Sequence, residues 1–188
     1  MKDQNQYLIA ICGTHLRKNV GQIIHHVFNS SELESELVHN NDFNSYSTIV
    51  AIADPMIKKI LLIDMDETQD SFTTVTPDIT VLTDLSMSHT DVFSDFQAYT
   101  DRFEKLLLNT KGIIVANLAD ENVADMMKWI RKHTNAECLD YSRHMIETNL
   151  DQSEKMAGLA AFQIGLLLDI EPTKIIQAIN TFKKGSAS

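Results

Sequence analysis

The chain has 188 residues, 44% hydrophobic and 22% charged, which is the composition of a globular protein that can bury a substantial core. Its 26 Asp and Glu outnumber its 16 Lys and Arg, so the formal net charge of −10 argues against binding nucleic acid or anionic membranes. Its two cysteines, Cys12 and Cys138, are too few and too far apart for a disulfide framework or a thiolate zinc site. Without a signal-peptide pattern or a long apolar run, we expect a cytoplasmic protein.

Short apolar runs alternate with helical patterns along the chain. The run at 7–12 is strand-like and ends at Gly13, and the segment 20–28 then places its apolar residues on one helical face. Further strands are predicted at 48–53, 60–63, 79–85 and 113–116, with a candidate strand at 138–141. Further helices are predicted at 94–108, 121–132, 156–168 and 172–183. This alternation predicts an α/β fold with a mostly parallel sheet and helices on both faces. No linker interrupts it, so we expect residues 1–188 to form a single domain.

Polar clusters follow four of the predicted strands, at the edge where parallel sheets bind ligands. The first cluster is the turn 13–19, which begins with Gly13 and leads into a helix. Such a turn is either a cradle for an anion or a structural connection. It lacks the Gly-Lys-Ser/Thr sequence that holds phosphate and magnesium in phosphate-binding loops.

The second and third clusters contain candidate metal ligands. Asp64, Asp66 and Glu67 follow the strand 60–63, and carboxylates at a strand end can hold Mg²⁺ through their oxygens. The alternative is a solvated acidic loop. His89 follows the next predicted strand and is either a further metal ligand or an ordinary loop histidine.

The fourth cluster is an amide and a carboxylate after the strand 113–116. Asn117 and Asp120 could contact the edge of an adenine ring, or they could cap the helix that begins near Glu121. If the ancestral arrangement survives, Gly13, Asp66, His89 and Asn117 should line one crevice.

Several segments form a recognisable series. Residues 9–15 read Ile-Ala-Ile-Cys-Gly-Thr-His, 64–67 read Asp-Met-Asp-Glu, and 77–79 read Pro-Asp-Ile. The segment 83–91 carries a Thr-Asp-Leu start and a His-x-Asp end, and 115–117 read Val-Ala-Asn. In this order the segments resemble the central, ATP-binding domain of the Mur ligase family, in particular the UDP-N-acetylmuramate–L-alanine ligase type. The resemblance covers nearly the whole chain.

The resemblance implies a P-loop-like α/β domain that uses ATP and Mg²⁺ in peptidoglycan synthesis. The family activates a carboxylate as an acyl phosphate, which an amine then attacks. The implied nucleotide-binding residues are Gly13, Thr14, His15, Arg17, Lys18, Asn117 and Asp120. The implied metal ligands are Asp64, Asp66, Glu67 and His89. The implied partners are a nucleotide and a protein of cell-wall metabolism, and no catalytic residue is assigned.

The chain departs from the family pattern at the residues that matter for ATP. Leu16, Arg17 and Lys18 stand where the family has Gly-Lys-Thr. The leucine side chain crowds the path of a phosphate, the arginine fork is not an equivalent point charge, and a lysine cannot ligate magnesium. Asp84 replaces the family's Asn, and Ser88 replaces an aspartate.

Two hypotheses follow. The first is a pseudoenzyme with impaired ATP binding and no stand-alone ligation, in which the family's N-terminal and C-terminal domains are absent. The alternative is a functional ATP- and Mg²⁺-binding ligase module that acts with a partner chain.

Overall fold

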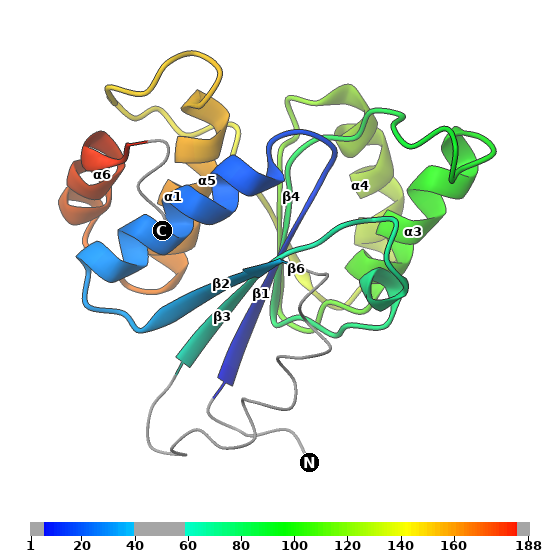
Figure 1. The fold of residues 1–188 in the computed structure, drawn as a ribbon, viewed down its shortest axis with the longest axis horizontal. Coiled ribbons are helices and arrows are strands. Elements are labelled where there is room, and N and C mark those ends of the chain that lie inside the picture. Colours follow the sequence, from blue (N-terminus) through cyan, green and yellow to red (C-terminus); the bar gives the residue numbers. More distant parts are fainter. Residues whose placement is uncertain (1–5, 40–58, 184–188) are drawn as a thin grey trace.

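The computed structural model describes residues 6–39 and 59–183. In these ranges six strands form one sheet in the order β2-β3-β1-β4-β5-β6, and every neighbouring pair is parallel (Figure 1). The strands are β1 (Gln6–Cys12), β2 (Ser35–His39), β3 (Lys59–Asp64), β4 (Ile79–Leu82), β5 (Ile113–Ala116) and β6 (Glu137–Asp140). The predicted mostly parallel sheet is therefore confirmed.

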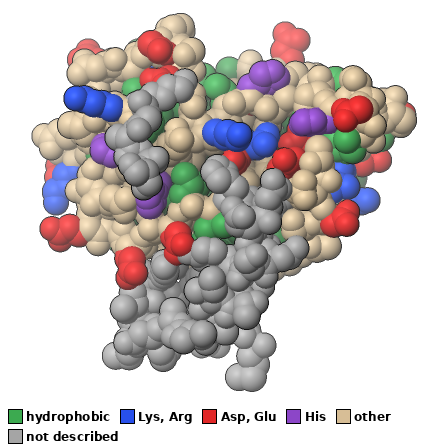
Figure 2. Space-filling view, in the orientation of Figure 1, with side chains coloured by type: hydrophobic (Ala, Val, Ile, Leu, Met, Phe, Trp, Pro, Cys, Tyr) green, Lys and Arg blue, Asp and Glu red, His purple; other side chains and the backbone are tan. Residues whose placement is uncertain are grey.

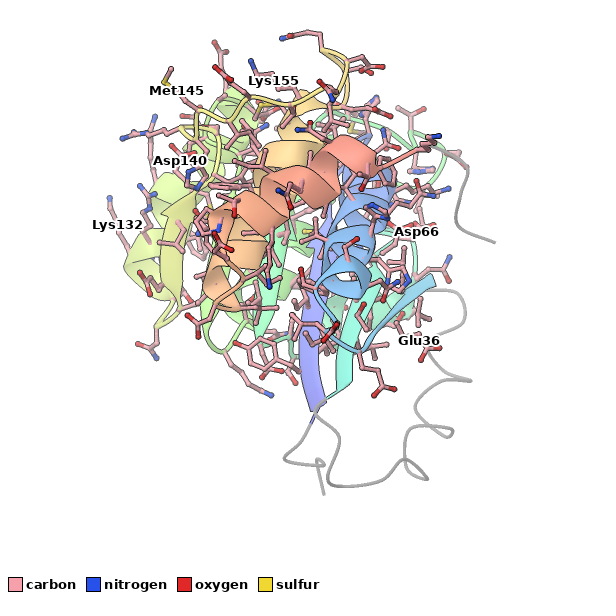
Figure 3. All side chains as sticks on the ribbon, turned by 90° about the vertical axis from the view of Figure 1, so that its left-hand side faces the viewer. Glu36, Asp66, Lys132, Asp140, Met145 and Lys155 are labelled. Carbon is pink, nitrogen blue, oxygen red and sulfur yellow. The ribbon has the colours of Figure 1, made fainter. Side chains whose placement is uncertain are left out.

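Helices cover both faces of the sheet, as predicted. Helices α1 (Arg17–Ser30), α5 (Lys155–Leu167) and α6 (Pro172–Thr181) pack together on one face, and the side view places α1 and α6 in front of the strands (Figure 3). The short 3₁₀-helix η3 (Asp70–Thr73) and helices α3 (Phe96–Leu108) and α4 (Glu121–His133) lie on the other face.

The central strand β1 shows why its sequence is almost continuously apolar. Ile9 and Ile11 belong to the core under α1, α5 and α6, whereas Ala10 and Cys12 belong to the core under α3 and α4. All four side chains are fully buried. Because successive side chains of a strand point to opposite faces, a strand covered by helices on both sides must be apolar at every position.

Three details of the strands differ from prediction or lie beyond it. Strand β2 was not predicted, and the strand predicted at 48–53 lies outside the described residues. The strand predicted at 79–85 ends at Leu82. Thr83 still donates its amide hydrogen to the Cys12 carbonyl at 3.0 Å, but the chain then leaves the sheet and crosses over the end of β1.

The register brings the carboxyl ends of the central strands into line. Cys12 pairs with Leu82, Leu82 with Ala116, and Ala116 with Asp140. The loops after β1, β3, β4 and β5 therefore emerge from one edge of the sheet, and the candidate site is built from them. Among the described residues, no helix has the length and apolar character needed to cross a membrane.

Candidate functional site

The first loop turns sharply at Gly13. Its φ of +137° lies in the region that favours glycine, and a β-carbon there would collide with the Thr83 hydroxyl. The same β-carbon would approach the Asp84 amide nitrogen to 3.0 Å. Glycine is therefore required because the loop after β1 packs directly against the loop after β4.

Thr14 fastens these two loops to helix α3. Its hydroxyl donates to the Ser86 carbonyl at 3.0 Å and accepts from the Ser86 amide at 2.9 Å. It also lies 2.7 Å from the hydroxyl of Tyr99, a fully buried side chain of α3. Burial raises the pKa of the Tyr99 hydroxyl, so this contact joins two neutral groups. The Thr14 side chain is thus engaged inside the protein.

The amide groups at the start of α1 face a carboxylate of the protein itself. Asp84 accepts hydrogen bonds from the His15 amide, at 3.1 and 3.2 Å, and from the Leu16 amide at 3.2 Å. The His15 ring Nδ1 lies 3.1 Å from Asp84 Oδ2, and the Thr83 hydroxyl donates to Oδ1 at 2.7 Å. Two of the amides that could hold an anion at this turn are therefore already in use.

Arg17 lies among the carboxylates that follow β3. Its Nε donates to Asp64 Oδ1 at 2.8 Å, and its Nη1 lies 3.5 Å from Glu67 Oε2. Its Nη2 is 4.0 Å from Asp66 Oδ2, and Nη1 also donates to the Gly13 carbonyl at 3.3 Å. The Asp64 and Glu67 side chains are 3% and 0% exposed, so the guanidinium is the counter-ion of two buried carboxylates.

His89 reaches the same cluster from the other side. Its Nε2 is 3.8 Å from Glu67 Oε1, and the Ser88 hydroxyl donates to that oxygen at 3.3 Å. Burial raises the pKa of Asp66, but hydrogen bonds from Thr68 and the positive charge of Arg17 outweigh it and hold this pKa below its ordinary value. Within 6–39 and 59–183, no three His, Cys, Asp or Glu side chains are arranged to hold a metal ion.

The remaining predicted nucleotide ligands have structural partners or lie in solvent. Asn117 donates to the Thr83 carbonyl at 2.9 Å and accepts from the Ala119 amide at 3.2 Å. Asp120 accepts from the Val123 amide at 2.9 Å and is the N-cap of α4, which matches the capping alternative. Lys18 is exposed and makes no ion pair with any residue of the described ranges.

The structure thus brings Gly13, Arg17, Glu67 and His89 together, while Asn117 adjoins them through Thr83. The space-filling view shows basic, acidic and histidine side chains near the middle of this face, between the two groups of helices (Figure 2). Asp84 is the residue whose place in the site the sequence did not reveal. The available signal was its replacement of an Asn of the family pattern.

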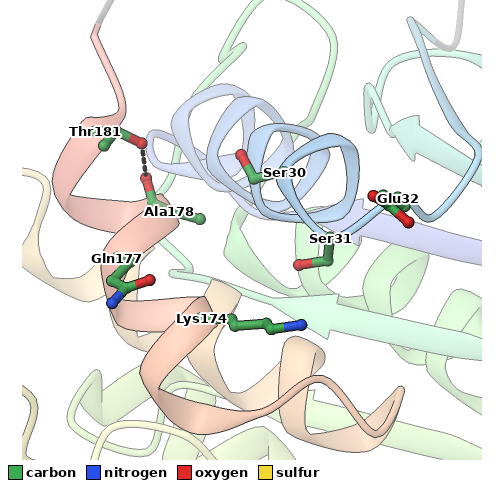
Figure 4. Close-up of a pocket in the computed structure, with 7 residues that line it drawn as sticks. All are labelled: Ser30, Ser31, Glu32, Lys174, Gln177, Ala178 and Thr181. Atoms are coloured by element: carbon green, nitrogen blue, oxygen red, sulfur yellow. Dashed lines mark hydrogen bonds between the residues drawn. The ribbon is translucent and has the colours of Figure 1, made fainter.

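A separate hollow lies far from this cluster. A cavity of about 410 Å³ opens between the last turn of α1 and helix α6, and Ser31, Lys174 and Thr181 are among its lining residues (Figure 4). Thr181 donates its hydroxyl hydrogen to the Ala178 carbonyl at 2.9 Å. This cavity is at the opposite end of α1 from Arg17, so it is not part of the candidate site.

Comparison with known proteins identifies the family. Residues 63–162, more than half of the chain, match the model of the Mur ligase middle domain. The chain belongs to the Mur ligase middle domain family. The matched residues include the acidic cluster, Asp84, His89 and Asn117, whereas the loop that begins at Gly13 precedes them.

Curated relatives agree with this Mur ligase assignment. A UDP-N-acetylmuramate–L-alanine ligase of Geotalea uraniireducens is 24% identical over 165 residues, which are 87% of this chain and 35% of the relative. A protein of the same name from Caldicellulosiruptor saccharolyticus is 27% identical over 135 residues, 71% of this chain and 29% of the relative. The chain therefore spans about a third of the length of these relatives.

Solved structures share the fold at low sequence identity. The MurF ligase of Thermotoga maritima, solved in complex with ADP, has a TM-score of 0.74 at 11% identity and covers 96% of this chain and 49% of its own. A ligase from Neisseria meningitides that joins UDP-N-acetylmuramate to a tripeptide has a TM-score of 0.70 at 16% identity, covering 96% of this chain and 66% of its own. The Mur ligase fold thus extends over the first loop as well.

Proposed function

We propose that this chain is a Mur ligase-type domain that binds Mg²⁺–ATP weakly or not at all and completes no ligation on its own. The observation that carries the proposal is the position of Arg17, whose guanidinium pairs with Asp64 and Glu67. The family resemblance implies that these carboxylates bind a magnesium ion, so the guanidinium stands in place of that ion. Residues 1–188 act as one domain in this proposal.

The ion pairs of Arg17 oppose binding of a magnesium ion. A metal ion that used Asp64, Asp66 and Glu67 would have to displace the guanidinium from two buried carboxylates. Each charge-assisted hydrogen bond that is lost costs about 1.5–3 kcal/mol, or roughly one to two decades of affinity. Lys18 lies in solvent and offers no oxygen ligand in compensation.

The first loop opposes binding of phosphate in the same way. The Leu16 side chain packs against the apolar core on the α1 face, so the loop is anchored by a residue that replaces a glycine of the family pattern. The Thr14 hydroxyl is held by Ser86 and Tyr99. A triphosphate in this loop would also have to displace the Asp84 carboxylate from the His15 and Leu16 amides.

The wider role that we propose is non-catalytic participation in cell-wall precursor metabolism, with a protein of that metabolism as partner. The curated relatives are named UDP-N-acetylmuramate–L-alanine ligases, and a reaction of this type must bring ATP, a carboxylate and an amine together. This chain spans about a third of such a relative.

A functional ATP- and Mg²⁺-binding module that acts with a partner chain is the second candidate. It is favoured by the glycine turn at Gly13 and by carboxylates and a histidine at the adjoining strand ends. In this alternative, ligand binding would swing Arg17 from the carboxylates onto a phosphate group.

Nucleotide turnover tests whether the chain completes a ligation on its own. The chain is incubated with Mg²⁺–ATP, UDP-N-acetylmuramate and L-alanine, and ADP formation is measured beside the Geotalea uraniireducens relative as a positive control. We expect no ADP above the level of a protein-free blank. ADP formation that depends on all three substrates would overturn the proposal.

A further inference from the structure

We propose that the Asp84 carboxylate is an internal anion that occupies the anion cradle of the first loop, formed by the His15 and Leu16 amides, and prevents phosphate from binding there. The inference deepens the proposed function, on which it rests for the identity of the loop. Its carboxylate accepts from the amides of His15 and Leu16 at 3.1–3.2 Å and from the Thr83 hydroxyl at 2.7 Å. One side chain thus takes the hydrogen bonds that a bound oxyanion would use.

The groups around Asp84 have the chemistry of an anion site. The Leu16 amide is at the N-cap of α1 and the His15 amide directly precedes it, beside the end of the helix where unpaired N–H groups and the helix dipole give partial positive charge. The His15 ring lies 3.1 Å from the carboxylate and 3.2 Å from the Ser86 hydroxyl. Without the charge of Asp84, this set would suit a tetrahedral oxyanion such as phosphate.

The Asp84 carboxylate competes strongly for the His15 and Leu16 amides because the Asp84 backbone is fixed next to the first loop. The Thr14 amide donates to the Asp84 carbonyl at 3.1 Å, and the turn at Gly13 packs against the Asp84 backbone. A tethered group competes with a free ligand at an effective concentration of about millimolar or higher. A phosphate must also approach a carboxylate of the same charge that is only 14% exposed.

The family pattern supplies the test. The family has Asn at the position of Asp84, and Asp84→Asn has the same shape but no charge. Its carbonyl oxygen can still accept from the His15 and Leu16 amides, but a neutral acceptor holds them more weakly than a carboxylate and no longer repels an anion. Asp84→Asn should therefore release the two amides to a phosphate ion.

The experiment titrates the ¹⁵N-labelled chain with inorganic phosphate at constant ionic strength, without metal, and follows the His15 and Leu16 amide signals. Asp91→Asn is the matched control. Asp91 is an exposed carboxylate of the same loop, and its substitution removes the same charge from the molecule. We expect Asp84→Asn to bind phosphate at least about tenfold more tightly than the unmodified chain and Asp91→Asn to be unchanged.

Two results would overturn the inference: a folded Asp84→Asn chain with no gain in phosphate affinity, or an equal gain in Asp91→Asn. If Asp84→Asn does not fold, Asp84→Ser is titrated in its place and judged by the same results. The proposed function has a separate test. Tight Mg²⁺–ATP binding by the unmodified chain would refute that function together with the inference that rests on it, whereas a failed gain in Asp84→Asn would refute only the role of Asp84.

Discussion

Arg17 stands where the family pattern has a lysine, and its shape explains its place in this structure. A guanidinium presents five N–H groups in a planar fork and can bond several oxygens at once, whereas an ammonium is a compact point charge. Arg17 uses this fork to bond Asp64, Glu67 and the Gly13 carbonyl. We propose that the substitution converts a ligand-binding position into a structural ion pair.

Replacing Arg17 should therefore destabilise the fold. Arg17→Ala removes the guanidinium that pairs with the buried Asp64 and Glu67 carboxylates, and removing one partner of a buried pair costs about 3 kcal/mol. Urea unfolding should show a clearly lower midpoint. Lys18→Ala, the neighbouring basic residue in solvent, should change the free energy of unfolding by less than about 0.5 kcal/mol. Equal midpoints for the two variants would contradict this role of Arg17.

At the scale of elements, the polar residues after β5 organise the start of helix α4. Asp120 accepts from the Val123 amide, and Asn117 ties the same loop to the Thr83 carbonyl. An Asp at the N-cap satisfies one of the amides that the first helical turn leaves unpaired. Both side chains therefore have a role in folding that needs no nucleotide.

Substitutions at Asp120 test this capping role. Asp120→Ala should lower the free energy of unfolding by about 1 kcal/mol, because the cap is lost. Asp120→Asn should be nearly neutral, since Asn caps as well as Asp does. Thermal or urea unfolding of the three chains measures the difference. A loss in Asp120→Asn as large as that in Asp120→Ala would show that charge, not capping, is what matters.

Most helices and strands could be predicted because their burial pattern is periodic. The helices observed at Phe96–Leu108 and Glu121–His133 lie within two residues of their predicted ends. Strand β2 could not be found, because Ser35–His39 contains only two strongly apolar residues and lies at an edge of the sheet. The strand ending at Leu82 was predicted too long, because Thr83 continues the β-type pattern while the backbone already turns.

The location of the candidate site was predictable, but the pairing within it was not. Because polar residues after successive strands meet at one end of a parallel sheet, we expect Gly13, Asp66, His89 and Asn117 in one crevice. Arg17 contacts both Gly13 and Asp66, and His89 approaches the neighbouring Glu67. Whether a carboxylate meets an amide, a guanidinium or a ligand depends on contacts between loops that are distant in sequence. Asp84 and His15 are 69 residues apart, and nothing local indicates their contact.

At the scale of the whole molecule, stability should depend on pH. Asp66 and Asp140 belong to different strand ends and lie on opposite sides of the molecule in the side view (Figure 3). Burial raises the pKa of Asp140, but hydrogen bonds from Ser142 outweigh it, so its pKa is below the ordinary value, as for Asp66. A depressed pKa means that the unfolded chain binds protons first as pH falls.

These carboxylates should therefore stabilise the chain fully above the ordinary Asp pKa of 3.8 and lose this contribution as pH falls through their lower folded-state values. Urea unfolding between pH 7 and pH 3 should show a fall concentrated below about pH 5. Asp140→Asn should be less stable at pH 7 and lose less on acidification. An unchanged pH profile in Asp140→Asn would contradict the assignment.

The chain is a Mur ligase-type α/β domain in which the loops at the carboxyl ends of the strands pair charges of the protein itself. In our proposal, Arg17 takes the place of a cation and Asp84 takes the place of an anion. The contacts of Arg17 and Asp84 lie at the carboxyl end of the sheet and outside its two cores. The fold therefore does not depend on whether the first loop and the acidic cluster contact a ligand or each other.

The most direct test is a melting titration of the unmodified chain with Mg²⁺–ATP up to 1 mM. A ligand at 100 times its Kd adds about 2.7 kcal/mol to the free energy of unfolding, which raises the Tm of a domain of this size by several degrees. We predict no significant change in Tm across the titration. A saturable rise of several degrees at sub-millimolar Mg²⁺–ATP, abolished in Arg17→Ala, would contradict the account.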